Sequence, residues 1–242
     1  MAVKTGILGL DAMLYGGIPE GDQVVIVGGP GAGKTLISFE MLYRGAKAGS
    51  PGIFYALEED PSRVLQNAQA AFPDLKADID DLISKKKLII DGREPTEKML
   101  SGGDVSAYEF GKVMAEIEDK IAQIGANRVI VDSASILSLL INDPIAYRRS
   151  MIQLINNMRR LKVTSILTME AETPERSKLA FKPEFFIFDG IISMYQTGEG
   201  DKRTRAMEII KMRGTRHSFV TTPYDITPSG FKVYSAEDTS LY

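Results

Sequence analysis

Two kinds of hydrophobic pattern alternate along the chain. Short apolar runs predict strands at residues 23–27, 53–57, 88–90, 128–132 and 163–168. Between them, apolar residues at helical spacing predict helices over 35–48, from Asp60-Pro61 onward, over 106–124 and from Asp143-Pro144 onward. Strands that alternate with crossover helices form a mostly parallel sheet with helices on both faces, so we predict an α/β fold.

The pattern changes after residue 185. Two β-rich runs, 187–195 and 205–212, flank a polar turn, and this predicts an antiparallel hairpin added to the sheet edge. Residues 231–234 predict one further strand. The sequence contains no long linker rich in Pro, Gly or Ser and no internal repeat. We therefore expect residues 1–242 to form a single domain.

Composition excludes several kinds of chemistry. The 242 residues include no Cys and one His, which excludes disulfides, cysteine nucleophiles and a histidine-rich metal centre. With 29 Lys and Arg against 32 Asp and Glu, the net charge of −3 argues against general binding to a polyanion. The sequence has neither a membrane-length apolar run nor a leader pattern, so we expect a cytoplasmic protein.

Residues 28–35 carry the strongest motif. They read Gly-Gly-Pro-Gly-Ala-Gly-Lys-Thr, which fits G-x-x-x-x-G-K-[ST], and they lie directly between a predicted strand and a predicted helix. In such a loop, backbone N–H groups surround the phosphates, Lys34 reaches the β- and γ-phosphates and the Thr35 hydroxyl holds Mg²⁺. The residues expected to bind the nucleotide are Gly29, Pro30, Gly31, Ala32, Gly33, Lys34, Thr35 and Leu36.

Three carboxylates follow predicted strands and supply the remaining catalytic candidates. Asp132 ends the run 128–132 and would lie beside the phosphate loop if the two strands are neighbours, as a second Mg²⁺ ligand. Glu58 and Glu59 close the run 53–57, where a carboxylate can act as general base for the attacking water. Glu58 is the first choice and Glu59 the second, although adjacent acids at a strand end are also commonly just solvated.

The order of the motifs extends this interpretation. The chain reads TGILGLD at 5–11, GGIPEG at 16–21 and KMRGTRH at 211–217, besides the phosphate loop, the paired glutamates and Asp132-Ser133. Over nearly its whole length it resembles the single-domain KaiC-like ATPases of the RecA superfamily. The resemblance implies a RecA-like P-loop NTPase that binds and hydrolyses ATP with Mg²⁺. It also implies assembly into a ring, usually a hexamer, with ATP between neighbouring subunits.

The resemblance also assigns roles near the C-terminus. It implies that Lys211 and Arg213 act in trans on the γ-phosphate of the adjacent subunit. Met212, Thr215 and His217 would line the same nucleotide edge, with Thr227 a weaker candidate. From the residues alone, 211–217 is a solvated basic turn after a strand.

Three functions stay open at this point. The first is a ring-forming ATPase that regulates a protein partner, the second a recombinase-like DNA-dependent ATPase, and the third an ATP-binding scaffold with little turnover, like a regulator of the motility machinery. Residues 92–106 and 170–184 are the candidate loops for single-stranded DNA. The balanced charge favours the first function over the second, and the full set of catalytic candidates favours it over the third.

Overall fold

The computed structural model describes residues 1–93, 106–141, 143–171, 173, 176, 182–197 and 204–234, and for 106–110, 139–140 and 197 the backbone alone. The strands in these ranges form a two-stranded sheet and a nine-stranded sheet of order β11-β10-β9-β8-β3-β7-β6-β4-β5. The six strands from β8 to β5 are parallel, and the other three continue the sheet in antiparallel fashion. The predicted α/β fold is confirmed.

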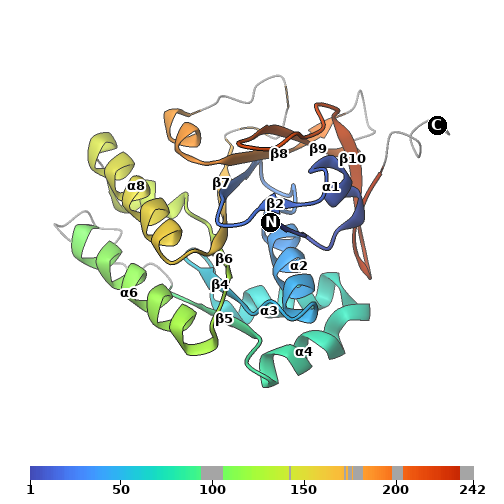
Figure 1. Ribbon diagram of the computed structural model, residues 1–242, viewed down its shortest axis with the longest axis horizontal. Helices are drawn as coiled ribbons and strands as arrows, with labels where there is room; N and C mark the ends of the chain where they lie inside the picture. The colour runs from blue at the N-terminus through green and yellow to red at the C-terminus, as the bar shows by residue number, and fades with distance from the viewer. Residues whose placement is uncertain are drawn as a thin grey trace.

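The large sheet has helices on both faces (Figure 1). Its parallel strands are β3 (Gln23–Gly28), β4 (Gly52–Ala56), β5 (Leu88–Gly92), β6 (Arg128–Asp132), β7 (Thr164–Glu170) and β8 (Gly190–Thr197). The helices α2 (Lys34–Lys47), α3 (Pro61–Ala71) and α4 (Lys76–Ser84) lie on one side, with α6 (Ser106–Ile124) and α8 (Pro144–Arg160) on the other.

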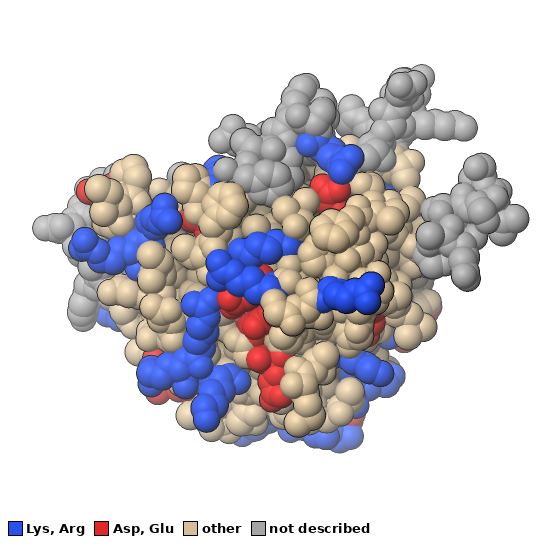
Figure 2. All heavy atoms as spheres, turned by 45° about the horizontal axis from the view of Figure 1, so that its top comes forward, with Lys and Arg blue, Asp and Glu red and all other residues tan. Residues whose placement is uncertain are grey.

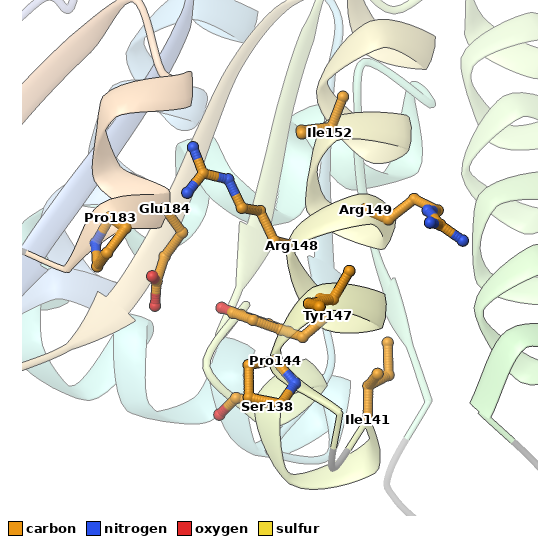
Figure 3. Close-up of a pocket in the computed structure, with 10 residues that line it drawn as sticks. Ser138, Ile141, Pro144, Tyr147, Arg148, Arg149, Ile152, Pro183 and Glu184 are labelled. Carbon is orange, nitrogen blue, oxygen red and sulfur yellow. The ribbon is translucent and has the colours of Figure 1, made fainter.

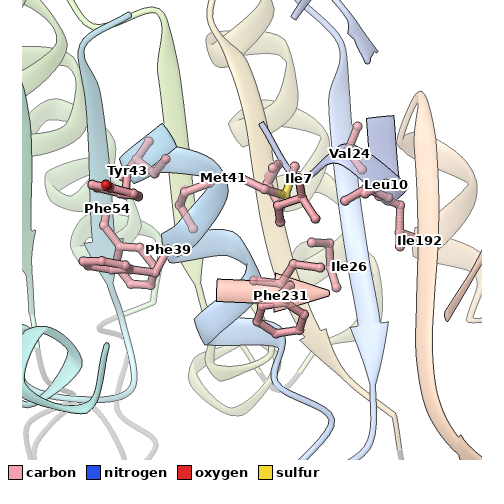
Figure 4. Packing of buried hydrophobic residues seen from close by; sticks show 14 of the residues in the cluster. Ile7, Leu10, Val24, Ile26, Phe39, Met41, Tyr43, Phe54, Ile192 and Phe231 are labelled. Carbon is pink, nitrogen blue, oxygen red and sulfur yellow. The ribbon is translucent and has the colours of Figure 1, made fainter. Parts of the chain in front are cut away.

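Each face of the sheet has its own hydrophobic core, because successive strand residues point to opposite sides. Val24 and Ile26 of β3 belong to the core on the α2 side, where Figure 4 shows them near Leu10. Val25 and Val27 belong to the core on the α8 side. All four are completely buried, which explains why β3 is a continuous apolar run rather than an alternating one.

Two of the predicted helix starts show the expected capping. The Asp60 carboxylate accepts backbone N–H bonds at the start of α3, and the Asp143 carboxylate does so at the start of α8. A proline follows each aspartate at the first helical position, where its missing N–H costs nothing. These local signals therefore act as the sequence predicts.

The predicted C-terminal hairpin is confirmed. β8 pairs antiparallel with β9 (Thr204–Met212) and also joins the sheet parallel to β3. The strand predicted at 231–234 is β11 (Gly230–Val233), and it pairs with β10 (Thr222–Thr227), which the sequence analysis missed because Pro223 and Asp225 interrupt its apolar pattern. Other unpredicted elements are β1 (Ala2–Val3), α1 (Leu8–Met13), β2 (Ile18–Pro19), η1 (Pro73–Leu75), α4, α7 (Ile136–Leu140) and η3 (Pro183–Ile187).

The direction of the strands defines two edges that matter for function. We call the edge where β3, β4, β6 and β7 end the carboxyl edge, and the opposite edge the amino edge. At the amino edge β8 begins and β9 ends, because Gly190 pairs with both Met212 and Val24.

Candidate active site

The phosphate loop joins the end of β3 to the start of α2. Gly31 and Gly33 have φ values of 73° and 92°, a left-handed conformation that residues with a Cβ adopt only with strain. At Gly28 a side chain is excluded for a different reason, since a Cβ there would lie 2.5 Å from the Met194 carbonyl oxygen of β8. The motif glycines therefore serve both the turn and the close contact between β3 and β8.

Residues distant in the sequence brace this loop. The Tyr224 hydroxyl of β10 donates to the Ala32 carbonyl, and the Ile226 and Phe231 side chains lie against Gly33. Gly29 and Ala32 are buried, whereas Pro30 and Gly31 are exposed at the tip and Leu36 is half-buried. Tyr224 was not among the predicted site residues, because its role depends on β10, which the sequence pattern does not reveal.

Lys34 lies buried at the beginning of α2. Its Nζ donates to the Gly29 carbonyl at 3.2 Å and lies 3.4 Å from Oε1 of Glu170. Glu170 is the last residue of β7, at the carboxyl edge. The sequence analysis considered Glu170 only as part of a candidate DNA loop, yet its strand-end position is the same signal that singled out Asp132.

Thr35 and Asp132, the two residues predicted to hold Mg²⁺, lie in contact with each other. The Thr35 hydroxyl donates to Oδ2 of Asp132 at 2.8 Å, and the Thr168 hydroxyl donates to Oδ1. Burial raises the pKa of Asp132, and these two hydroxyls together with the nearby Lys34 charge oppose that rise. A hydroxyl and a carboxylate oxygen are hard donors that suit Mg²⁺.

The reasoning that linked Asp132 to the phosphate loop was wrong in one respect. It required β3 and β6 to be neighbours, but β7 lies between them. Asp132 still contacts Thr35, because the phosphate loop leads from the end of β3 into α2 and places Thr35 within hydrogen-bond distance of the end of β6. The position of Thr35 at the second residue of α2 therefore matters as much as strand adjacency.

Glu58 and Glu59 point to different surroundings. Desolvation and then the charges of Glu170 and Asp132 raise the pKa of Glu58, while the nearby Ser133 hydroxyl and the Lys34 charge lower it. Glu59 accepts a hydrogen bond at 3.0 Å from Asn67, on the helix that follows, and its charge contributes to the raised pKa of Asp132. The structure thus brings Glu58 together with Lys34, Asp132 and Glu170.

The predicted trans-acting residues lie at the opposite edge of the sheet. Lys211 precedes the last residue of β9, and Arg213 follows that strand directly. Strand register puts this end of β9 level with Val24, four residues or about 13 Å along the sheet from Gly28. Lys211 and Arg213 are therefore remote from the phosphate loop of their own chain.

The other residues predicted to contact the nucleotide lie in different parts of the protomer. Met212 is buried in the core beside Gly190, with 4 % exposure. Thr215 is exposed after the end of β9, and Nδ1 of His217 lies 3.0 Å from the Ser218 carbonyl oxygen. Thr227 ends β10 at the carboxyl edge and donates to the Gly230 carbonyl at 2.7 Å. Thr227 and the segment around Arg213 therefore belong to different edges of one protomer.

A sequence profile described as "ATPase: KaiC" matches residues 3–238. The chain belongs to this KaiC ATPase family. It is 35 % identical over 233 residues to a UPF0273 protein of Aeropyrum pernix, an alignment that covers 96 % of this chain and 93 % of the relative. It is 30 % identical over 234 residues to the circadian clock oscillator protein KaiC of Picosynechococcus, covering 96 % of this chain and 44 % of that protein.

A solved structure supports the same assignment. The KaiC-like protein PH0186 from Pyrococcus horikoshii superposes with a TM-score of 0.81 at 30 % identity, covering 97 % of this chain and 99 % of that one. The KaiC family membership and the RecA-like P-loop fold expected from the motifs are confirmed. Among the described residues, no helix is long and apolar enough to span a membrane.

Several basic side chains of this KaiC-family chain are paired with acids. Arg160 contacts Glu118 at 2.6 Å, and Arg176, from one of the candidate DNA loops, contacts Glu208 at 2.8 Å. In Figure 2, basic and acidic residues adjoin each other across the part of the face drawn in colour. Most of the candidate loops at 92–106 and 170–184 lies outside the described residues.

Two basic residues, Arg148 and Arg149, border a hollow of about 680 Å³ between α7, α8 and η3. Figure 3 shows the Arg148 and Tyr147 side chains directed toward Glu184, with Arg149 directed the other way. Most of the other lining residues are apolar, among them Ile141, Pro144 and Ile152. The hollow shares no lining residue with the phosphate loop and is not the nucleotide site that the motifs define.

Proposed function

We propose that this KaiC-family chain is a Mg²⁺-dependent ATPase whose single domain, residues 1–242, assembles into a homohexameric ring with ATP bound between subunits. The observation that carries the proposal is the separation of two groups of site residues. Lys34, Thr35, Asp132 and Glu58 lie at the carboxyl edge, and Lys211 and Arg213 lie at the amino edge of the same sheet. Two such edges complete one site when they belong to neighbouring subunits.

The phosphate loop binds the triphosphate of ATP. Backbone N–H groups of residues 29–35 and the N-terminus of α2 supply partial positive charge, and Lys34 supplies a full charge. Thr35 and Asp132 would hold Mg²⁺, which neutralises charge on the phosphate oxygens when bound. Lys34 also pairs with Glu170 at 3.4 Å, so its positive charge is held at the carboxyl edge by a carboxylate.

Glu58 acts as the general base. Desolvation, followed by the charges of Glu170 and Asp132, raises its pKa and thereby makes it a better proton acceptor than an ordinary glutamate. The attacking water loses its proton to Glu58 as it adds to the γ-phosphorus, and ADP leaves. Glu59 bonds to Asn67 on α3 and takes no part in this step.

Lys211 and Arg213 act on the ATP held by the adjacent subunit. Negative charge grows on the γ-phosphate oxygens in the transition state, and guanidinium and ammonium groups stabilise it. Because these cations come from a second subunit, hydrolysis depends on assembly. The cellular role that we propose is the regulation of a protein partner, which would bind the ring differently according to the nucleotide-dependent conformation of its subunits.

The direct experiment measures the mass of the protein and its ATP turnover together. With ATP and Mg²⁺ we expect a hexamer and steady release of phosphate, and chelation of the metal should stop that release. A monomer under all conditions would contradict the proposal. Single-stranded DNA should leave turnover unchanged, whereas strong stimulation that weakens with salt would favour the recombinase-like alternative.

A further inference from the structure

Asp189 lies at the amino edge of the sheet between two arginines. Nη2 of Arg159, from α8, donates to both carboxylate oxygens of Asp189 at 2.9 Å. Nη1 of Arg213 lies 3.4 Å from Oδ1, and the backbone N–H of Gln23 donates to Oδ2 at 3.1 Å. The Asp189 side chain is 13 % exposed, so its charge is shielded from water and shared among fixed partners.

Lys211 and Arg213, the two cations that we propose act in trans, both contact one backbone carbonyl near Asp189. The Phe186 carbonyl accepts from Nη2 of Arg213 at 3.1 Å and from Nζ of Lys211 at 3.4 Å. Two like charges on one carbonyl repel each other. Desolvation and the Arg213 charge lower the pKa of Lys211, and the Asp189 carboxylate opposes this effect.

We propose that Asp189 is the positioning residue for Lys211 and Arg213, because it supplies the counter-charge that holds the two cations side by side until the phosphates of a neighbouring subunit replace it. This inference rests on the proposed function, in which both cations act across the subunit boundary. The contact between Asp189 and Arg213 is long, whereas Arg159 keeps the carboxylate paired. Arg213 can therefore move away from Asp189 while Arg159 still neutralises the buried Asp189 carboxylate.

A second carboxylate faces the same cluster. Oδ2 of Asp22, in the turn before β3, is buried without a hydrogen-bond partner in the described part of the chain. Desolvation and the Asp189 charge raise the pKa of Asp22 to about 6, against the opposing charges of Arg159 and Arg213. The groups facing one another are thus Asp22, Asp189, Arg159, Lys211 and Arg213, and their total negative charge falls as the pH drops below this value.

The first arm of the test needs no catalysis. Lysines of the full-length, nucleotide-free protein are reductively methylated with ¹³C-formaldehyde, and the Lys211 pKa is read by NMR titration. Asp189→Asn should lower that pKa, Asp189→Glu should restore it, and Asp78→Asn, a surface control that unpairs Lys47, should leave it unchanged. An unchanged Lys211 pKa in a folded Asp189→Asn variant would overturn the proposal.

The second arm separates positioning from general damage. Asp189→Asn should lower kcat about 10-fold in the parent, yet change it less than about 2-fold in a Lys211→Ala/Arg213→Ala background. The same factor in both backgrounds would mean a structural role and overturn the proposal. If Asp189→Asn does not fold, the comparison is made with Asp189→Ser, which also removes the charge.

The pH profile gives an independent signature. Turnover of the parent should decline as Asp22 becomes protonated, and Asp22→Asn should remove that step near pH 6. Because Glu58 also gives kcat an acid limb, the readout is the difference between the two profiles, and identical profiles near pH 6 would count against the cluster. If Lys211→Ala/Arg213→Ala turned over ATP as fast as the parent, the proposed function would fail, while the titration of Lys211 would still decide whether Asp189 holds the cations together.

Discussion

The two edges of the sheet differ in how firmly their site residues are held. At the carboxyl edge, Thr35 donates to Asp132 at 2.8 Å, Lys34 is buried between Gly29 and Glu170, and Tyr224 braces the phosphate loop. At the amino edge, the Arg213 side chain is 54 % exposed and its side-chain contacts measure 3.1 and 3.4 Å. The residues of the carboxyl edge are held by several close contacts, whereas Arg213 at the amino edge is more than half exposed.

The largest effect is expected from removing the base at the carboxyl edge. Glu58→Gln should lower kcat roughly 10²–10⁴-fold, because an amide cannot accept the proton of the attacking water. ATP binding should persist, since the phosphate loop is untouched. The measurement is phosphate release together with binding of a fluorescent ATP analogue.

The matched control is Glu59→Gln, the adjacent carboxylate that bonds to Asn67 instead. Its kcat should stay within about 3-fold of the parent, because this side chain faces α3 rather than the phosphates. Equal losses in the two variants would remove the distinction between these neighbours.

A smaller effect on stability should follow from loosening the brace over the phosphate loop. Glu40 of α2 is fully buried, with its carboxylate bonded to Arg44 at 2.6 Å and to the Phe231 backbone N–H at 2.6 Å. Glu40→Ala leaves that N–H without an acceptor and should lower the free energy of unfolding by about 1–3 kcal/mol. Chemical denaturation measures the loss, and Glu118→Ala, which breaks a surface pair with Arg160, should cost at most about 1 kcal/mol. If the two variants lose equal free energy of unfolding, β11 is not anchored to α2 through Glu40.

The smallest effect is a displacement of the pH profile. Glu58 must be ionised to accept a proton, and its raised pKa places the acid limb of kcat above that of an ordinary glutamate. Glu170→Gln removes one of the negative charges that raise this pKa, so the acid limb should move to lower pH. The readout is kcat against pH under saturating ATP. A limb that stays in place or moves upward would contradict the arrangement of Glu58 and Glu170.

The sequence was most informative where the signal is local. The phosphate loop, the capped helices and the hairpin of β8 and β9 each follow from adjacent residues, and the motif order led to the KaiC family. Contacts that depend on strand order were harder to predict from the sequence. Asp132 reaches Thr35 although β7 separates their strands, and the contact of Glu170 with Lys34 requires knowing which strand lies beside β3.

Strand geometry also explains where Met212 lies. Alternate residues of a strand point to opposite faces, so Met212 enters the core while Lys211 faces away from it. A segment chosen by motif contains both kinds of position, and the motif does not separate them. The apolar residues of β9 do not alternate regularly and its pairing with β8 shifts register, so the sequence pattern did not distinguish Met212 from the two cations.

Mixing two inactive variants tests most directly whether one site is shared between two edges. Lys34→Ala removes the phosphate contact at the carboxyl edge, and Arg213→Ala removes the cation at the amino edge, so each protein alone should hydrolyse ATP poorly. In a mixed ring, some boundaries combine an intact Lys34 with an intact Arg213 from the neighbour, and ATP turnover should recover to a fraction set by the mixing ratio. Turnover that stays at the level of the separate variants, in rings shown to contain both, would contradict a site built from two subunits.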